Sequence, residues 1–162
     1  MKTIEKVYLS WDDVEKNCQD LADKIKHDSV IYDIILSVGR GGLIPTRLLS
    51  EYLRIKRVEI YNVKSYTDIA SQGKIISTPF NYQLLNNKEV LVVDDVYTTG
   101  DTMNYVTSSI YQNVDEIFIA TCAMYYNTNQ KWSINKPDIW SQEYDAKTKW
   151  LVFPWEFDED RK

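Results

Sequence analysis

The sequence has few of the residues that interrupt or cross-link a chain: five glycines, four prolines and two cysteines among 162 residues. This scarcity of glycine and proline argues against long flexible linkers, and the length suits one domain around one hydrophobic core. Cys18 and Cys122 lie far apart and do not have the spacing of metal ligands. We therefore expect two buried, reduced thiols rather than a metal site or a disulfide framework.

Long apolar runs are absent as well. No apolar run approaches 18 residues, and none follows a basic N-terminus, so we expect neither a membrane span nor a signal peptide. The net charge of −5 argues against nucleic-acid binding, which depends on a basic surface. An acidic chain can still bind a polyphosphate when backbone amides, a few cations and a metal ion build the site. We therefore predict a cytoplasmic protein.

Apolar periodicity predicts alternating helices and strands. A helix is predicted over 11–26, with Ser10 as its N-cap, and we interpret His27 as a helix-end residue rather than a catalyst. Further helices are predicted over 43–53 and 101–112, and strands over 32–38, 58–63, 90–93 and 116–123. Nearly continuous apolar strands are typical of a parallel sheet buried on both faces. The order predicts a Rossmann-like, doubly wound α/β fold with a mainly parallel sheet.

Two segments do not have a clear period. Residues 65–78 are polar and are predicted to form a mobile loop. From about residue 125 the chain is predicted to form a small hood on the sheet, together with the N-terminal segment and with a short strand at 150–153. We expect one domain over residues 1–162, with its core at about 28–124.

The strongest functional signal is the segment 90–102, VLVVDDVYTTGDT. Its predicted strand would deliver Asp94 and Asp95 to the carboxyl end of the sheet, where ligands bind in open parallel sheets. The turn that follows supplies hydroxyls and amides at a helix N-terminus, which favours phosphate. Acids beside a phosphate suit hydrogen bonds from sugar hydroxyls, or Mg²⁺ and its waters. The alternative, two acids that cap a helix before an ordinary turn, explains each residue singly but not their combination.

A second glycine turn follows the predicted strand at 32–38. It contains Gly39, Arg40, Gly41 and Gly42, and the next predicted helix begins directly after it. The Arg40 guanidinium would lie beside exposed backbone amides, a combination that suits pyrophosphate. A glycine turn after a strand is ordinary by itself, so this turn gains its weight from the first segment.

Segment 90–102 resembles the phosphoribosyl pyrophosphate signature of the type I phosphoribosyltransferases, and segment 39–45 resembles their pyrophosphate loop. The resemblance implies that Asp94 and Asp95 hold the ribose hydroxyls, and Mg²⁺ mainly through those hydroxyls and water. It implies that the 5′-phosphate is bound by Thr98, Thr99, Gly100, Asp101 and Thr102, and the pyrophosphate by Gly39, Arg40, Gly41 and Gly42. The Asp101 carboxylate departs from the family pattern, and it must either point away from the phosphate or weaken its binding.

Two further stretches resemble the same family. The polar loop opens on Ser65 and Tyr66, which resemble the flexible catalytic loop that closes to exclude water. Residues 149–156, KWLVFPWE, resemble the hood of small 6-oxopurine enzymes of the archaeal and xanthine–guanine types. There the resemblance implies that Trp150 stacks on the base and that the backbone of Leu151 reads its edge. The alternative for Trp150 is a core aromatic that seals the hood.

The resemblance implies an enzyme that transfers ribose 5-phosphate from phosphoribosyl pyrophosphate to a free base, releasing pyrophosphate. It also implies a requirement for Mg²⁺ and a homo-oligomer, a dimer or higher. We expect the base to be a 6-oxopurine. A pyrimidine or modified base, or a non-catalytic regulator that binds phosphoribosyl pyrophosphate or a nucleotide, remains an alternative.

These alternatives rest on two departures from the 6-oxopurine pattern. Thr98 stands where those enzymes usually have an aspartate near N7 of the purine, and threonine cannot accept a proton at neutral pH. Tyr125 stands where they usually have a lysine at the 6-oxo group, so it would donate only a neutral hydrogen bond. Lys131 is a candidate replacement for that lysine.

Overall fold

The computed structural model describes residues 4–66, 74–129 and 136–161. Its elements follow one another as β1 (Glu5–Tyr8), α1 (Trp11–His27), β2 (Ile34–Gly39), α2 (Leu43–Tyr52), β3 (Val58–Tyr66), β4 (Lys74–Ser77), a 3₁₀ turn (Tyr82–Leu85), β5 (Lys88–Tyr97), α3 (Asp101–Asn113), β6 (Ile117–Asn127), β7 (Ile139–Tyr144) and β8 (Lys149–Val152). Helices and strands alternate through most of the chain, as predicted.

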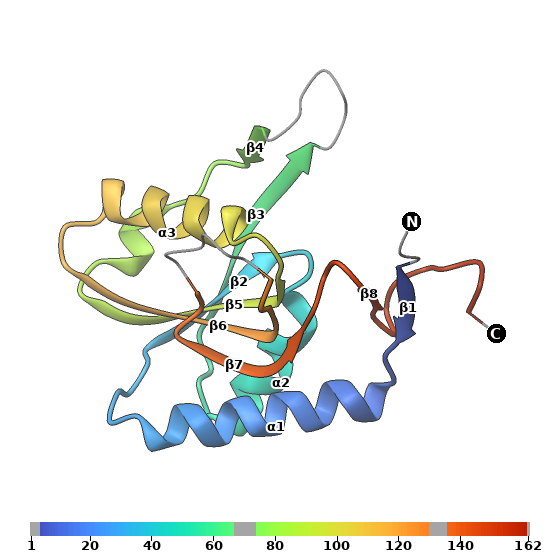
Figure 1. Ribbon diagram of the computed structural model, residues 1–162. Helices are drawn as coiled ribbons and strands as arrows, with labels where there is room; N and C mark the ends of the chain where they lie inside the picture. The colour runs from blue at the N-terminus through green and yellow to red at the C-terminus, as the bar shows by residue number, and fades with distance from the viewer. Residues whose placement is uncertain (1–3, 67–73, 130–135, 162) are drawn as a thin grey trace.

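The centre of the molecule is a six-stranded sheet in the order β4-β3-β2-β5-β6-β7. Its strands pair in parallel, except that β4 runs antiparallel to β3. Helix α3 lies on one face of this sheet, and α1 and α2 lie on the other (Figure 1). The predicted α/β fold with a mainly parallel, doubly wound sheet is confirmed.

The central strands are apolar on both sides because both faces of the sheet are covered. In β2, Ile34 and Leu36 pack with residues of α3, whereas Ile35 packs with residues of α1 and α2. Strand β5 alternates in the same way, with Val92 toward α3 and Leu91 toward α1. Burying each such side chain contributes about 1.5–3 kcal/mol. Because β2 and β5 pair in parallel, their carboxyl ends lie side by side.

Helix α1 begins and ends as its sequence predicts. The Ser10 hydroxyl accepts a hydrogen bond from the Asp13 amide at 3.1 Å, and the Ser10 amide donates to the Asp13 carboxylate at 2.8 Å. His27 is its last residue, with Nδ1 2.7 Å from the Asp23 carbonyl oxygen. The buried residues of its inner face include Val14, Cys18, Leu21, Ala22 and Ile25. Cys18 and Cys122 are buried, free thiols, as expected.

Three strands lie where the sequence predicted none: β1 in the N-terminal segment, β4 and β7. Strand β4 falls inside the predicted loop 65–78 and pairs with the end of β3, so that loop is in part a β-hairpin. Strand β7 falls inside the predicted hood but adds to the edge of the main sheet beside β6. Edge strands need few buried residues, and of β7 only Ile139 is buried, so neither strand shows a long apolar run.

The hood itself is a small two-stranded sheet in which β1 pairs in parallel with β8. The chain then returns over β1, bringing its two ends to the same side of the molecule (Figure 1). Lys6 forms ion pairs with Asp158 at 3.1 Å and with Asp160 at 2.7 Å, and Arg161 donates to the Val152 carbonyl at 2.9 Å. Among the described residues, we find no helix long and apolar enough to cross a membrane.

Candidate functional site

The tip of β5 carries two half-buried carboxylates. Asp94 accepts a hydrogen bond from the Asp95 amide at 2.9 Å, and Asp95 accepts one from the Val96 amide at 2.7 Å. Burial raises the pKa of Asp94 well above its usual range, and the neighbouring Asp95 charge adds to the effect. Burial also raises the pKa of Asp95 to about 6, with the Glu156 charge acting in the same direction. A bound cation, or several hydroxyl groups that donate hydrogen bonds, would stabilise the ionised form of both carboxyl groups.

A small cavity of about 240 Å³ lies under the turn after β5. It is lined by Asp94, Asp95, Val96, Tyr97, Thr98, Thr99, Gly100, Thr102 and Met103. Gly100 has a φ of 85°, and a Cβ there would collide with the Tyr97 hydroxyl. Asp101, the first residue of α3, accepts a hydrogen bond from the Thr99 hydroxyl at 2.8 Å and is not among the lining residues. The Asp101 amide donates to the Thr99 hydroxyl at 3.3 Å, and the helix N-terminus that begins there makes this turn suitable for a phosphate.

Thr98 forms contacts with β6 and β7, the two strands that follow β5 in the order of the sheet. Its hydroxyl oxygen lies 2.9 Å from the hydroxyl of Tyr144 on β7, and its carbonyl accepts from the Asn127 amide group on β6 at 3.1 Å. These contacts fix the position of the turn relative to β6 and β7.

The loop between β2 and α2 lies against the tip of β5. A Cβ on Gly41 would lie 2.6 Å from both carboxylate oxygens of Asp95, and a Cβ on Gly42 would collide with the Val93 carbonyl. Glycine at both positions therefore permits the two loops to touch. The peptide bond before Arg40 is cis, and the Arg40 side chain is exposed.

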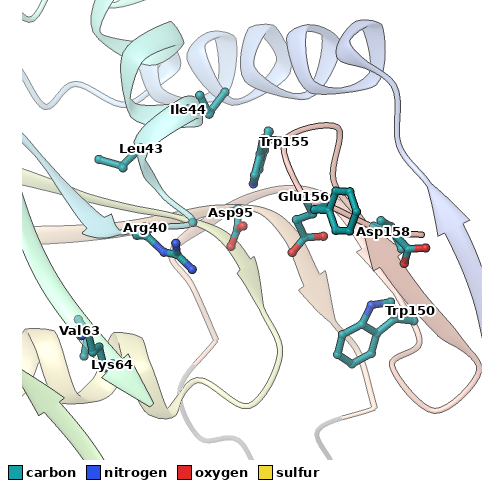
Figure 2. A pocket seen from close by; sticks show the side chains of 13 residues that line it. Arg40, Leu43, Ile44, Val63, Lys64, Asp95, Trp150, Trp155, Glu156 and Asp158 are labelled. Carbon is teal, nitrogen blue, oxygen red and sulfur yellow. The ribbon is translucent and has the colours of Figure 1, made fainter. Parts of the chain in front are cut away.

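A second cavity, of about 1350 Å³, connects these loops to the hood. It is lined by Arg40, Gly41, Leu43, Ile44, Val63, Lys64, Asp95, Trp150, Val152, Trp155, Glu156, Phe157 and Asp158. Figure 2 shows Asp95 between Arg40 on one side and Glu156 and Trp150 on the other, with Lys64 at the far end beyond Arg40. The cavity therefore has a cationic end, carboxylates at its middle and an aromatic end at the hood.

The hood supplies the aromatic end. Trp150 is 62% exposed and lines the cavity, so it is not the core aromatic that the sequence left open as an alternative. Trp155 is held by stacking on Phe153, with ring centroids 4.7 Å apart and planes 14° apart. Glu156 accepts a hydrogen bond from the Phe153 amide at 2.9 Å, which fixes its carboxylate at the cavity wall.

Some predicted residues lie elsewhere. Tyr125 is buried on the α1 side of the sheet, where its hydroxyl accepts from Asn17 at 2.8 Å, so it is not brought to either of these cavities. The Leu151 side chain packs against the core on the same side, and the role predicted for its backbone stays a prediction. Ser65 and Tyr66 lie at the end of β3, with no description of their side chains, and Lys131 lies outside the described residues. Glu156 and Phe157, which line the large cavity, were not predicted as site residues.

The chain is similar in sequence and structure to known phosphoribosyltransferases. The family model described as phosphoribosyl transferase domain matches residues 6–162. Purine phosphoribosyltransferase from Pyrococcus horikoshii Ot3 has a similar structure, with a TM-score of 0.79 and 32% identity over 97% of this chain and 99% of the other. Xanthine phosphoribosyltransferase 1 from Saccharomyces cerevisiae is 24% identical over 94% of this chain and 90% of the yeast protein. Hypoxanthine-guanine phosphoribosyltransferase from the same yeast is 27% identical over 96% and 88%.

Proposed function

Because the chain belongs to the phosphoribosyl transferase family, we propose that it transfers ribose 5-phosphate from phosphoribosyl pyrophosphate to a 6-oxopurine. The observation that carries this proposal is the position of Asp95, which lines both cavities. A ribose held there would have its 5′-phosphate in the small cavity. Its C1 atom would face the large cavity, between the cations and the aromatic end.

This arrangement assigns a task to each part of the site. The pyrophosphate lies toward Arg40 and the glycine loop, whose guanidinium and amides stabilise the charge that develops as the C1–oxygen bond breaks. The ring nitrogen of the base approaches C1 from the hood side and forms the new bond. Asp94 and Asp95 orient the ribose through its hydroxyls. The protein forms no covalent bond with the substrate, so positioning and electrostatics supply the rate enhancement.

The carboxylates also fit a Mg²⁺ ion. Among residues 4–66, 74–129 and 136–161, no three acidic, histidine or cysteine side chains converge into a cage. Mg²⁺ ordinarily takes one or two carboxylates and completes its shell with waters and substrate phosphate oxygens. Asp94 and Asp95 would hold it through ribose hydroxyls and water, and Glu156 lines the large cavity together with Asp95. When bound, the ion would neutralise charge on the pyrophosphate.

The choice of base rests on the hood and on the relatives. The relatives named above are phosphoribosyltransferases for xanthine, for hypoxanthine and guanine, or for purine. Trp150 offers a stacking surface for a planar base. Since Tyr125 is turned away and Thr98 is neutral, we expect hypoxanthine, guanine and xanthine to differ less in turnover than in a site with charged base contacts.

A scan of free bases with labelled phosphoribosyl pyrophosphate tests this function. We expect labelled nucleoside monophosphate from at least one 6-oxopurine and none from orotate, uracil or nicotinate. Turnover of only a pyrimidine or nicotinate would keep the phosphoribosyl transfer and replace the base. Binding of phosphoribosyl pyrophosphate without turnover of any base would favour a regulator.

We further propose that the protein is a homo-oligomer. Size-exclusion chromatography with light scattering would measure its oligomeric state.

A further inference from the structure

Phe157 is the most exposed large apolar side chain in the part of the chain that the structure describes, with 93% of its surface accessible. It lines the large cavity together with Trp150, which is itself 62% exposed. Leaving a phenylalanine ring in water forgoes the favourable free energy of its burial. An exposed aromatic pair in one cavity is typical of a surface that a ligand covers.

The backbone on both sides of Phe157 is held in place. Before it, the Glu156 carboxylate accepts from the Phe153 amide, and the Glu156 amide donates to the Phe153 carbonyl at 3.0 Å. After it, the Asp158 carboxylate accepts from Lys6 at 3.1 Å and from the Tyr8 hydroxyl at 3.2 Å. The phenyl ring is therefore presented to the cavity by two anchored neighbours rather than carried on a loose tail.

The arrangement of charged and aromatic residues along the cavity indicates which part of the substrate would contact the Phe157 ring. Arg40 and Lys64 lie at the far end, the Asp95 carboxylate lies between, and Trp150 lies toward the hood (Figure 2). A group attached at ribose C1 on the side away from the cations would lie among the hood aromatics. The cavity, at about 1350 Å³, is larger than the usual 300–1,000 Å³ of a ligand site. Trp155 also lines the cavity but is stacked on Phe153, so a base that met only the exposed Trp150 ring would be loosely held in such a space.

We propose that Phe157 is a base-binding residue that contacts the aromatic ring system of the acceptor alongside Trp150. This inference rests on the proposed function and assigns part of the base affinity to the segment after the FPWE turn. It also accounts for how a base can bind when Tyr125 is buried on the other side of the sheet and Thr98 offers only a neutral hydroxyl. Apolar and stacking contacts from two rings then supply affinity in place of charged contacts.

Steady-state kinetics of Phe157→Ala tests the assignment. We expect the KM for hypoxanthine or guanine to rise about tenfold, as for loss of one base–aromatic contact, while the KM for phosphoribosyl pyrophosphate stays within about twofold. Phe157→Tyr keeps the ring and should keep the KM for the base. Ile31→Ala is the matched control, since Ile31 is 87% exposed and does not line this cavity.

Each outcome separates this inference from the proposed function. A wild-type enzyme that turns over a 6-oxopurine while Phe157→Ala leaves the KM for the base unchanged would overturn the role of Phe157 alone. An equal rise in both KM values would mean that the change displaces the whole tail, and would also overturn it. Failure of the wild-type protein to use any base would overturn the proposed function and this inference together. Because the ring is exposed, the alanine variant opens no core cavity, and thermal unfolding should confirm an intact fold.

Discussion

Gly41 and Asp95 approach each other so closely that a Cβ on residue 41 would lie 2.6 Å from both oxygens of the Asp95 carboxylate. Such a contact cannot persist, so Gly41→Ala must displace either the loop or the carboxylate. Since Asp95 lines both cavities, we expect kcat/KM to fall about 100-fold, the loss that a misplacement of about 1 Å can cause. The melting temperature should change little, because Gly41 is only half-buried.

A double-mutant cycle with Asp95→Ala, measured as calorimetric affinity for phosphoribosyl pyrophosphate, isolates the contact, because alanine removes the atoms that a Cβ on residue 41 would meet. If Gly41→Ala acts through the Asp95 carboxylate, the change at residue 41 should cost little more affinity once that carboxylate has been removed. Additive losses of affinity in the double variant would show that Gly41 acts on the pyrophosphate loop by another route. Full activity of Gly41→Ala would contradict the importance of the close approach.

Removal of the metal should abolish binding of phosphoribosyl pyrophosphate. Asp95 and Glu156 both place carboxylates on the wall of the large cavity, so at pH 7.5, above the Asp95 pKa of about 6, a polyphosphate there would meet charge of like sign unless a divalent cation lay between them. Isothermal titration calorimetry with Mg²⁺ and with EDTA measures this directly. Equal affinity in the two buffers would contradict the proposed role of the ion.

Asp95→Asn and Arg40→Ala should each abolish transfer while leaving the fold intact.

The stability of the ligand-free protein should depend on pH through the same acid pair. Burial raises the pKa of Asp95 from about 3.9 in an unfolded chain to about 6, so the folded state holds more protons between these values. The free energy of unfolding therefore falls as pH rises from about 4 to 6, and the raised pKa of Asp94 acts in the same direction. Asp95→Asn should reduce this fall, and be more stable than the wild type at pH 7.5. Parallel melting curves from pH 5 to 7.5 would contradict the assignment.

The parts of the site that follow buried strands could be predicted from sequence. Apolar runs that end in Asp94-Asp95 and in the glycine turn identify strands β5 and β2, and parallel pairing brings their ends together. The side of the sheet on which Tyr125 lies could not be predicted from alternation. The β5–β6 register is the same at Asp94 with Ala123 and at Val96 with Tyr125, yet Met124 and Tyr125 both pack on the α1 side, and the sequence does not show this break in the alternation.

The hood was predicted in outline, but its lining was not. Trp150 could be identified from its resemblance to base-stacking tryptophans. Phe157 follows the matched segment, and its exposure depends on where Lys6 anchors Asp158, a contact across most of the chain. Short edge strands such as β7 bury too few side chains to leave an apolar pattern.

Thr98 offers a last test, on the choice of base. Its hydroxyl lies 2.9 Å from that of Tyr144, and it occupies the position where 6-oxopurine enzymes usually have an aspartate near N7. Thr98→Asp would put a carboxylate within reach of the Tyr144 hydroxyl, able to accept the purine proton as the new bond forms. We expect kcat/KM for hypoxanthine and guanine to rise by about tenfold or more.

Thr98→Asn is the matched control, because asparagine has the shape of aspartate but cannot accept the proton. It should bring no gain in kcat/KM. Tyr144→Phe in the aspartate background should lower part of the gain, since the Tyr144 hydroxyl would no longer orient the carboxylate. A higher KM for phosphoribosyl pyrophosphate without any gain in purine turnover would mean that Thr98 serves the 5′-phosphate alone. In that case the proton of the base leaves by a route that does not involve this turn, and the Tyr144 hydroxyl only positions the phosphate loop.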